Sequence, residues 1–216
     1  MRVIFLGPPG AGKGTQARRA AVRWGVPQIA TGDILREAMA AGTELGRRAK
    51  RYYDAGDLVP DDVIIGLVGE VLARPAARKG FILDGFPRTL AQAEALDRLL
   101  EERGVALDRV VVFDIPETAL VERLSGRRVC GQCGRNYHVR FSPSEQAGVC
   151  NACGGPVTYR KDDEEATVRN RLAVYARDTA PLVERYRRRG LVEPIDATGS
   201  VDDVFEAMLR ATERGR

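Results

Sequence analysis

The sequence has no long hydrophobic run, and this absence excludes whole classes of protein. None of its apolar stretches approaches the roughly 20 residues that a helix needs to span a bilayer. The early run Val3–Leu6 is too short for the core of a secretion signal, and no small-residue cleavage site follows it. We therefore expect neither membrane insertion nor secretion, and we place the protein in the cytoplasm.

Aromatic residues are also scarce, at 6%, whereas charged residues of both signs are abundant. The 216 residues include 34 basic and 30 acidic side chains, which gives a net charge of only +4. With 44% hydrophobic residues this is a globular balance, so wholesale disorder is excluded. The length suits one domain with small insertions. The slight positive excess suits a polyanionic partner, and composition does not distinguish nucleic acid from a small phosphate compound.

Short β-prone runs alternate with helical patterns along the chain. The expected strands are Val3–Leu6, Gln28–Ala30, Phe81–Leu83, Val110–Phe113 and Val192–Ile195. Near-continuous apolar runs of this length are typical of strands buried in a parallel sheet. After Pro60, Asp61 and Asp62 are placed to cap a helix with a single apolar stripe. The pattern predicts an α/β fold with a five-stranded parallel sheet flanked by helices.

The first expected strand leads into a glycine-rich loop, Gly7–Thr15, followed by a helix that we expect to start near Gln16. This strand–loop–helix context is what a phosphate-binding loop requires, and it disfavours a plain glycine-rich turn. Backbone N–H groups of such a loop surround phosphate oxygens, and Lys13 would bridge the β- and γ-phosphates of a nucleoside triphosphate. The hydroxyl residue, Thr15, comes one place later than usual, after Gly14. This variant narrows the choice among the families that have such a loop.

A second polar cluster, Asp84–Arg88, follows the expected strand Phe81–Leu83. An acidic side chain at the carboxyl end of a buried strand suits a magnesium ion held through water. The planar fork of Arg88 suits a phosphate. A capped turn with a surface arginine would explain the cluster equally well by itself. The phosphate loop in the same chain favours the binding site.

All four cysteines fall within 24 positions, as two Cys-x-x-Cys pairs separated by sixteen residues: Cys130, Cys133, Cys150 and Cys153. This spacing predicts a four-thiolate zinc site, which is structural because four sulfurs saturate the metal. Two disulfides are the alternative, and iron in place of zinc stays open. The surrounding segment, 126–163, has too weak an apolar pattern to build its own core, so we interpret it as an insertion held together by metal.

Three separated motifs, the loop Gly7–Thr15, Thr31-Gly32-Asp33 and Asp84–Thr89, together resemble the adenylate kinase family, in its long bacterial form with a zinc-bearing lid. The resemblance covers the chain from the first strand to the last helix. It implies a P-loop kinase-like fold and the reversible, magnesium-dependent transfer of the terminal phosphoryl group of ATP to AMP. Two ADP result, which serves adenine nucleotide homeostasis. It also implies a monomer that binds neither nucleic acid nor membrane.

The resemblance divides the chain into a core (1–29, 60–125 and 164–216), a helical AMP-binding segment (30–59) and a zinc-ribbon-like lid (126–163). The residues that it implies for ATP are Gly10, Ala11, Gly12, Lys13, Gly14, Thr15, Arg123, Arg127, Asn136, Tyr137 and Gly199. Those that it implies for AMP are Thr31, Arg36, Asp57, Leu58, Val59, Gly85, Phe86, Pro87, Arg88, Gln92, Arg160 and Arg171. The catalytic set that it implies is Lys13, Asp84, Arg88, Arg123, Arg160 and Arg171.

Some of these residues have a rival explanation in the sequence. Gln92 also fits a helix capping box that begins at Thr89, and Tyr137 is alternatively a packing residue of the lid. Arg171 gains support from the helical wheel, which points it toward the protein and Arg169 away. The run Arg185–Arg189 is best explained as a solvated helix face.

Two other functions remain open at this stage. One is a nucleoside monophosphate kinase with UMP or CMP as acceptor or GTP as donor, since backbone near Gly199 rather than a distinctive side chain would meet the donor base. The other is a zinc-ribbon NTPase that binds nucleic acid. The insertion has few basic residues interleaved with aromatics, which disfavours the second.

Overall fold

A computed structural model describes residues 1–213, and of Lys161 it describes the backbone alone. Its centre is a five-stranded, entirely parallel sheet in the order β2-β3-β1-β4-β8. The strands are β1 (Arg2–Leu6), β2 (Gln28–Ala30), β3 (Phe81–Asp84), β4 (Arg109–Asp114) and β8 (Val192–Asp196). The predicted fold class and all five predicted strands are confirmed, and four of the strands gain one residue at one or both ends.

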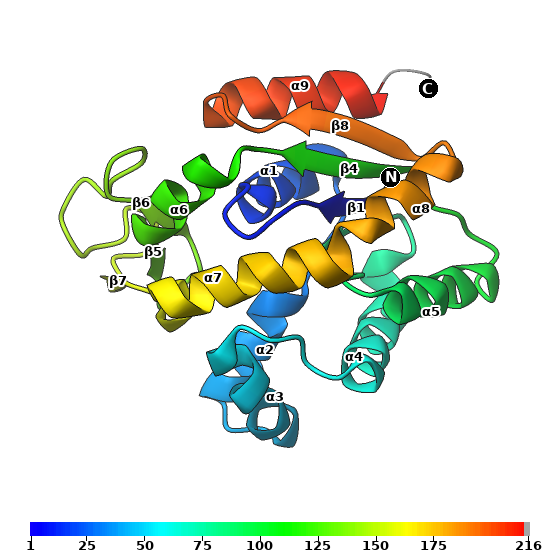
Figure 1. Cartoon of the computed structure of the whole chain (residues 1–216), viewed down its shortest axis with the longest axis horizontal. Coiled ribbons are helices and arrows are strands. Elements are labelled where there is room, and N and C mark those ends of the chain that lie inside the picture. Colours follow the sequence, from blue (N-terminus) through cyan, green and yellow to red (C-terminus); the bar gives the residue numbers. More distant parts are fainter. Residues whose placement is uncertain (214–216) are drawn as a thin grey trace.

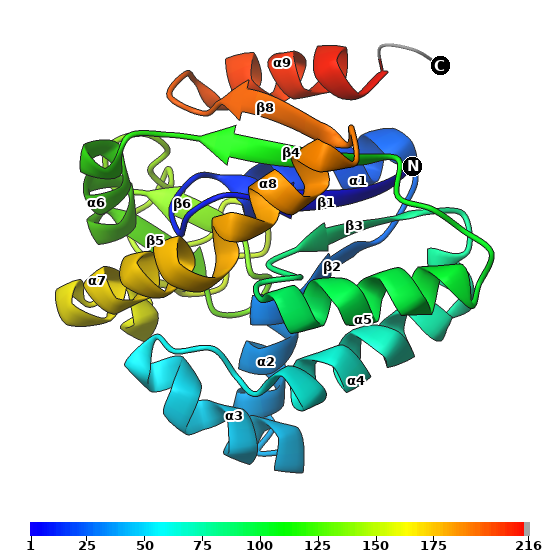
Figure 2. The same ribbon diagram turned by 45° about the vertical axis from the view of Figure 1, so that its right-hand side comes forward.

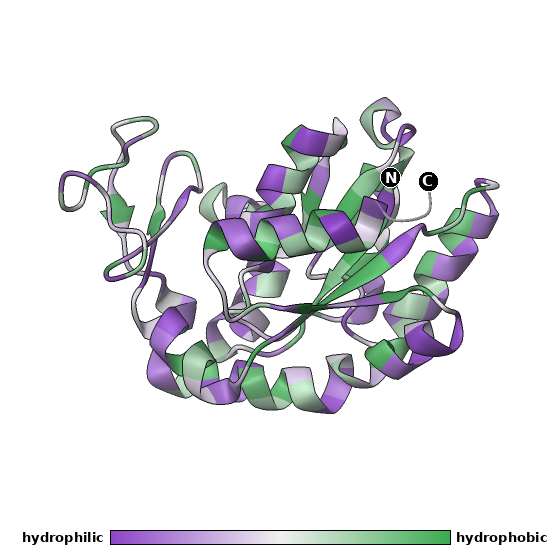
Figure 3. Ribbon diagram, turned by 90° about the horizontal axis from the view of Figure 1, so that it is seen from above, coloured by the Kyte–Doolittle hydropathy of each residue, from purple (hydrophilic) through white to green (hydrophobic). Residues whose placement is uncertain are grey.

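Helices cover both faces of the sheet (Figures 1 and 2). They are α1 (Lys13–Trp24), α2 (Thr31–Ala40), α3 (Glu44–Ala55), α4 (Asp61–Ala73), α5 (Leu90–Glu101), α6 (Glu117–Ser125), α7 (Glu165–Val174), α8 (Pro181–Arg188) and α9 (Val201–Glu213). Side chains alternate along β1, so Val3 and Phe5 pack with α1 and α9, while Ile4 and Leu6 pack with α4, α5 and α8. Figure 3 shows the result: the central strands are largely hydrophobic and the helices around them are mixed.

Two segments extend from the carboxyl end of this sheet (Figure 1). One contains α2 and α3. The other contains a small antiparallel sheet, in the order β6-β5-β7, built from β5 (Arg127–Cys130), β6 (Asn136–His138) and β7 (Val157–Thr158). Helix α3 packs against the short turn Lys161–Asp163 and against α7. The two segments therefore approach each other across the end of β1.

Two helix starts differ from their predictions. Helix α1 begins at Lys13 rather than near Gln16. Asp61 does not cap α4. Its carboxylate instead accepts hydrogen bonds from Thr89 Oγ1 (2.9 Å) and Gln92 Nε2 (2.7 Å). The sequence alone assigned the Asp61 carboxylate to the start of its own helix. In the structure it is bound instead by Thr89 and Gln92 at the start of α5.

The helical stretch that follows the segment 126–163 is interrupted. Helix α7 ends at Val174, and a π-helical turn, Tyr175–Thr179, joins it to α8. Pro181 has no N–H group, so it cannot donate to the carbonyl of Arg177, and the regular hydrogen-bond pattern cannot continue through it. Such π turns often lie at functional sites. This one lies beside the cavity described below.

Within residues 1–213, no helix is both long enough and apolar enough to cross a membrane.

Candidate active site and metal centre

The glycine-rich loop connects β1 to α1 at the carboxyl edge of the sheet. Gly10 and Gly12 adopt φ values of 88° and 90°, a region that side chains other than glycine rarely occupy. A Cβ at position 10 would also lie 2.9 Å from Cγ of Leu124. These glycines let the chain turn tightly into the first residue of α1, Lys13. The helix N-terminus and its unpaired N–H groups therefore face the loop.

Lys13 is folded back onto this loop. Its Nζ donates hydrogen bonds to the carbonyl oxygens of Gly7 (2.6 Å) and Pro8 (2.9 Å). Burial lowers the pKa of Lys13 to about 7, and it raises the pKa of the neighbouring Asp84, because the attraction between the two groups does not offset the loss of solvent. An anion bound in the loop would reverse the shift of the lysine.

Asp84 stands at the end of β3, directly beside the start of α1. Its Oδ2 accepts a hydrogen bond from Gln28 Nε2 at 3.0 Å. A Cβ at position 14 would lie 3.2 Å from the same oxygen. Any side chain at position 14 would crowd the Asp84 carboxylate, which explains why a glycine follows the lysine. The hydroxyl residue consequently comes one place later, at Thr15.

Two adjoining cavities open next to the loop, with about 770 and 400 Å³ of empty space when the solvent at their mouths is included. They share Gly32, Tyr53, Asp57, Leu58, Gly85 and Arg88. The predicted site residues that line at least one of them are Lys13, Thr31, Arg36, Asp57, Leu58, Val59, Gly85, Pro87, Arg88, Gln92 and Arg171. Residues from five separate parts of the chain therefore meet at one place.

The turn after β3 is held by hydrogen bonds that fix Arg88. The Gly85 carbonyl accepts from Thr31 Oγ1 and from Arg88 Nε, both at 2.8 Å. Gln92 Oε1 accepts from the Arg88 backbone N–H at 2.8 Å, while Thr89 Oγ1 accepts from the Gln92 N–H at 3.2 Å. The capping box predicted for Thr89 and Gln92 therefore exists in modified form, because the Gln92 side chain accepts from the N–H of Arg88, one residue before Thr89. Its side chain also lines the smaller cavity.

The arginines near the lid are paired with two buried carboxylates. Arg127 forms a two-pronged pair with Asp163, and Arg160 binds Asp162 through Nε (3.1 Å) and Nη2 (2.7 Å). Nη1 of Arg171 reaches both carboxylates, at 2.9 and 3.3 Å. Burial raises the pKa of Asp162, but Arg160 and Arg171 outweigh it and hold that pKa well below its usual range. The three arginines outnumber the two aspartates, so this cluster carries a net positive charge that is fixed at the wall of the cavity.

The orientation of Arg171 predicted from the helical wheel is confirmed. Its side chain is 19% exposed, against 76% for Arg169 on the same helix. Arg123 lies further out and donates to the carbonyl of Thr198 at 3.4 Å, which brings it beside Gly199. The run Arg185–Arg189 is only partly a solvated face, since Arg185 and Arg189 both pair with Asp97 of α5.

Several predicted site residues lie away from the cavities. The ring of Phe86 is fully buried in the core, so its side chain cannot line a binding pocket. Tyr137 packs inside the lid against Cys130 and Cys150, which is the packing alternative left open above. The cavity linings found within residues 1–213 also leave out most of the residues predicted for ATP and three of the predicted catalytic residues: Gly10, Ala11, Gly12, Gly14, Thr15, Asp84, Arg123, Arg127, Asn136, Tyr137, Arg160 and Gly199.

Sequence reasoning missed four polar side chains of this site. Tyr53, Asp162, Tyr175 and Thr179 all line the larger cavity. Thr179 Oγ1 also donates to the Arg88 carbonyl at 2.9 Å. In the sequence, the position of Asp162 between Arg160 and the start of a helix could have indicated this residue. No local pattern marked the other three, because they reach the cavity through the packing of α3 and of the π turn.

The four cysteines of the lid converge on one point. All four are free thiols, and their sulfurs lie within 4.8 Å of one another. The Sγ–Sγ distances of 3.5 Å from Cys130 to Cys153 and from Cys133 to Cys150 are far too long for disulfides. A tetrahedral zinc ion with Zn–S bonds of about 2.3 Å separates its sulfurs by roughly 3.8 Å. The geometry therefore fits a four-thiolate metal and rules out the disulfide alternative.

Hydrogen bonds from the lid support thiolates at this centre. Backbone N–H groups of Gln132 and Ala152 donate to Cys130 and Cys150, each at 3.4 Å. The Tyr137 oxygen accepts from the Asn151 N–H at 2.8 Å, which leaves its own O–H to donate to Cys150 Sγ at 3.2 Å. The Tyr137 bond is the main cause that lowers the pKa of Cys150, to about 6.

Replacing Tyr137 by phenylalanine should loosen the metal without removing any ligand. Loss of a hydrogen bond to a metal-bound group typically weakens metal affinity about 10- to 100-fold. When both proteins are loaded with zinc, we expect Tyr137→Phe to release it to a colorimetric chelator at a correspondingly lower chelator concentration than the parent. Tyr52→Phe, which removes a hydroxyl that bonds to Arg51 and not to a cysteine, is the control. Release curves that coincide for Tyr137→Phe and the parent would contradict the role of this hydroxyl.

The parallel sheet, the lysine at the first residue of α1 and the aspartate at the end of β3 define a P-loop enzyme, and the ring of arginines marks it as one that transfers phosphoryl groups. Comparison with known proteins makes the assignment narrower. The family model for adenylate kinase matches residues 5–191. The chain is 56% identical to the adenylate kinase of Moorella thermoacetica, over 99% of each chain. It is 50% identical to those of Thermodesulfovibrio yellowstonii (99% of this chain, 100% of the relative) and Archaeoglobus fulgidus (99% of each). The chain belongs to the adenylate kinase family and is a phosphotransferase.

Proposed function

We propose that the cavities described above hold AMP next to ATP and that the terminal phosphoryl group passes reversibly between them, giving two ADP. One observation carries this proposal. Lys13, Arg36, Arg88 and Arg171 come from separate elements and line a single cavity. Against the two carboxylates of the same lining, Asp57 and Asp162, these four basic groups leave an excess of positive charge. That excess calls for a ligand with several negative charges, and two nucleotides bound phosphate to phosphate supply them.

The AMP side of the site is the smaller cavity and its border with the larger one. Arg36 and Arg88 are assigned to the AMP phosphate because guanidinium forks match phosphate oxygens. Gln92 keeps one amide N–H and one lone pair beyond its bonds to Asp61 and Arg88, so its side chain has capacity left to contact an adenine edge. Leu58, Val59 and Ile64 offer apolar surface for the base.

The ATP side is assigned to residues 10–15 together with Arg123 and Arg127. Asp84 would hold Mg²⁺ through water, and the ion would neutralise charge on the transferring phosphates. The chemistry needs no protein nucleophile. Positioned reactants and fixed positive charge lower the barrier to in-line transfer. Arg160 and Arg171 would exchange Asp162 and Asp163 for phosphate oxygens when both nucleotides are bound.

We assign separate tasks to the three parts of the chain. The core (1–29, 60–125, 164–216) carries the phosphate loop, the segment 30–59 binds AMP, and the lid 126–163 excludes water, which would otherwise accept the phosphoryl group. Zinc in the lid would be structural, because four thiolates leave it no open position. We further propose a cytoplasmic monomer that binds neither nucleic acid nor membrane.

A coupled assay tests the substrate assignment. The protein is incubated with Mg²⁺, either ATP or GTP, and each of AMP, UMP, CMP and GMP, and diphosphate formation is followed. We expect the ATP and AMP pair to react at least tenfold faster than any other. Preference for UMP or CMP would reassign the acceptor, and equal rates with GTP would remove the donor assignment.

Nucleotide binding should be accompanied by proton uptake at Lys13. With a pKa of about 7, this lysine is mostly neutral at pH 8, and the negative phosphates of bound ATP raise that pKa again. Calorimetry of MgATP binding at pH 8, in buffers of different ionisation enthalpy, should give a slope approaching one proton taken up per site. Lys13→Met should abolish the slope. Equal slopes for the two proteins would contradict this role for Lys13.

A further inference from the structure

We infer that the hydroxyl of Tyr53 is a further ligand for the phosphate of the acceptor nucleotide, an inference that rests on the proposed function of this cavity. Tyr53 lies in the last turn of α3 and lines both cavities. Its oxygen accepts hydrogen bonds from Arg36 Nη1 at 2.5 Å and from Arg160 Nη2 at 3.2 Å. One oxygen thus connects an arginine of α2 with an arginine at the edge of the lid.

The proton of this hydroxyl is the group that points to a ligand. A guanidinium group only donates hydrogen bonds, so both arginines occupy lone pairs of the Tyr53 oxygen. The O–H hydrogen remains to be donated. Among residues 1–213, Tyr53 makes no hydrogen bond to a carboxylate or carbonyl that would accept it. The hydroxyl is therefore a donor with capacity left, at the border of the two cavities.

The surroundings of the hydroxyl select an anion as the acceptor. The same cavity is lined by Lys13, Arg36, Arg88 and Arg171. A phosphate monoester has several oxygens that can accept from these arginines and from Tyr53 together. The two arginines held at the Tyr53 oxygen are then oriented before the nucleotide arrives, which reduces the loss of side-chain freedom on binding.

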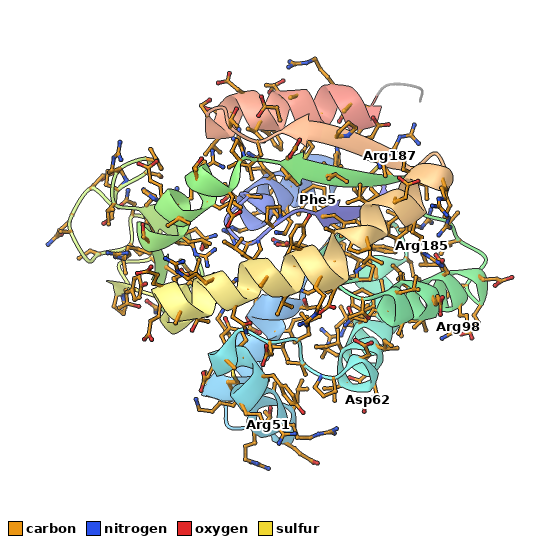
Figure 4. All side chains as sticks on the ribbon, in the orientation of Figure 1. Phe5, Arg51, Asp62, Arg98, Arg185 and Arg187 are labelled. Carbon is orange, nitrogen blue, oxygen red and sulfur yellow. The ribbon has the colours of Figure 1, made fainter. Side chains whose placement is uncertain are left out.

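The neighbouring Tyr52 has no such arrangement. Its ring packs against the hydrophobic core, and its hydroxyl accepts from Arg51 Nη2 at 2.6 Å. Arg51 lies at the outer edge of α3, away from the sheet (Figure 4). Removing the Tyr52 hydroxyl deletes the same atom one residue away from the cavity lining, which makes Tyr52→Phe a matched control.

Titration calorimetry of Tyr53→Phe with three ligands tests the inference. A hydrogen bond to a charged phosphate contributes enough to weaken AMP binding about 10- to 100-fold when it is lost. We expect a loss of this size for AMP, with the affinity for adenosine, which has no phosphate, unchanged. The affinity for MgATP should change less than about twofold. In the steady state, the KM for AMP should rise by a similar factor. Tyr52→Phe should match the parent in every measurement.

The possible results separate this inference from the proposed function. If the parent binds AMP and Tyr53→Phe binds it equally well, the inference is overturned and the proposed function stands. If Tyr53→Phe weakens adenosine and AMP by the same factor, the hydroxyl shapes the nucleoside pocket instead, and the inference is again overturned. If the parent itself neither binds AMP nor transfers phosphate to it, the proposed function fails, and the inference fails with it.

Discussion

Replacing Lys13 by methionine is expected to lower kcat/KM for phosphoryl transfer at least about 1000-fold, or roughly 4 kcal/mol of transition-state stabilisation. The lysine is the one basic group that the glycine-rich loop itself supplies, and its Nζ already contacts the loop carbonyls of Gly7 and Pro8. A charge fixed in a site that excludes water stabilises the transferring phosphoryl group far more than it would in solvent. A coupled assay with MgATP and AMP measures the loss.

The fold should survive this substitution. Because burial lowers the pKa of Lys13 to about 7, the unfolded chain binds its proton more strongly than the folded one. Lys13 therefore destabilises the folded protein at neutral pH and below, and this effect fades as the pH rises from about 7 toward the ordinary lysine value near 10.4. Methionine carries no such penalty, so the melting temperature at pH 7 should stay the same or rise.

Lys79→Met is the control for Lys13→Met, because Lys79 is an exposed lysine outside the cavity linings. It should retain the parent's kcat/KM. Should Lys13→Met convert ATP and AMP as fast as the parent, the assignment of the loop as the ATP site would have to be abandoned. A drop in melting temperature that explained the lost activity would equally count against a direct role.

Removal of the zinc that we propose for the four cysteines is expected to have the second large effect, this time on stability. Structural zinc contributes about 10–16 kcal/mol to the folding of small metal-bound domains. Even a quarter of that, transmitted through β5 and α7 to the core, would lower the melting temperature by roughly 5–15 °C for a chain of this size. The apolar contacts at the centre of the lid are few, with Cys130, Tyr137 and Cys150 as its buried cluster. Without metal, the segment keeps mainly its short sheet, β6-β5-β7, and these few apolar contacts.

Melting curves and limited proteolysis before and after chelation measure this effect. New cleavage should fall within residues 126–163, and added zinc should restore both the melting temperature and the resistance to protease. Cys130→Ser should resemble the chelated parent and respond little to chelator. A metal-free protein with full stability and full protease resistance would show that the cysteines do not form a structural site.

The local patterns of the sequence were sufficient for the sheet and the two chemical motifs. Strands such as Phe81–Asp84 are continuous apolar runs because both faces of the sheet are covered, and that property is visible in the chain itself. The phosphate loop and the cysteine pairs could also be predicted from the sequence, because their chemistry depends on residues close in sequence. The resemblance to a family extended this to residues of the cavity such as Arg36 and Arg88.

Contacts between segments far apart in the chain could not be predicted from such local patterns. Asp61 was expected to cap its own helix, but it binds Thr89 and Gln92, 28 and 31 residues away. Phe86 sits within a binding motif, yet its ring belongs to the core. In both cases a short pattern fits two environments equally well, and packing against another element selects one of them.

By itself, the sequence determined the class of fold, the glycine-rich loop and the cluster of four cysteines, since each follows from spacing along one segment. Only the tertiary structure decided which side chains meet at the cavity. Tyr53 reaches Arg36 and Arg160 because α3 packs against the turn Lys161–Asp163, and Asp162 and Asp163 are buried by the arginines that surround them. Hydrogen bonds between residues 17 and 107 positions apart depend on the relative placement of whole elements, and no local periodicity encodes that placement.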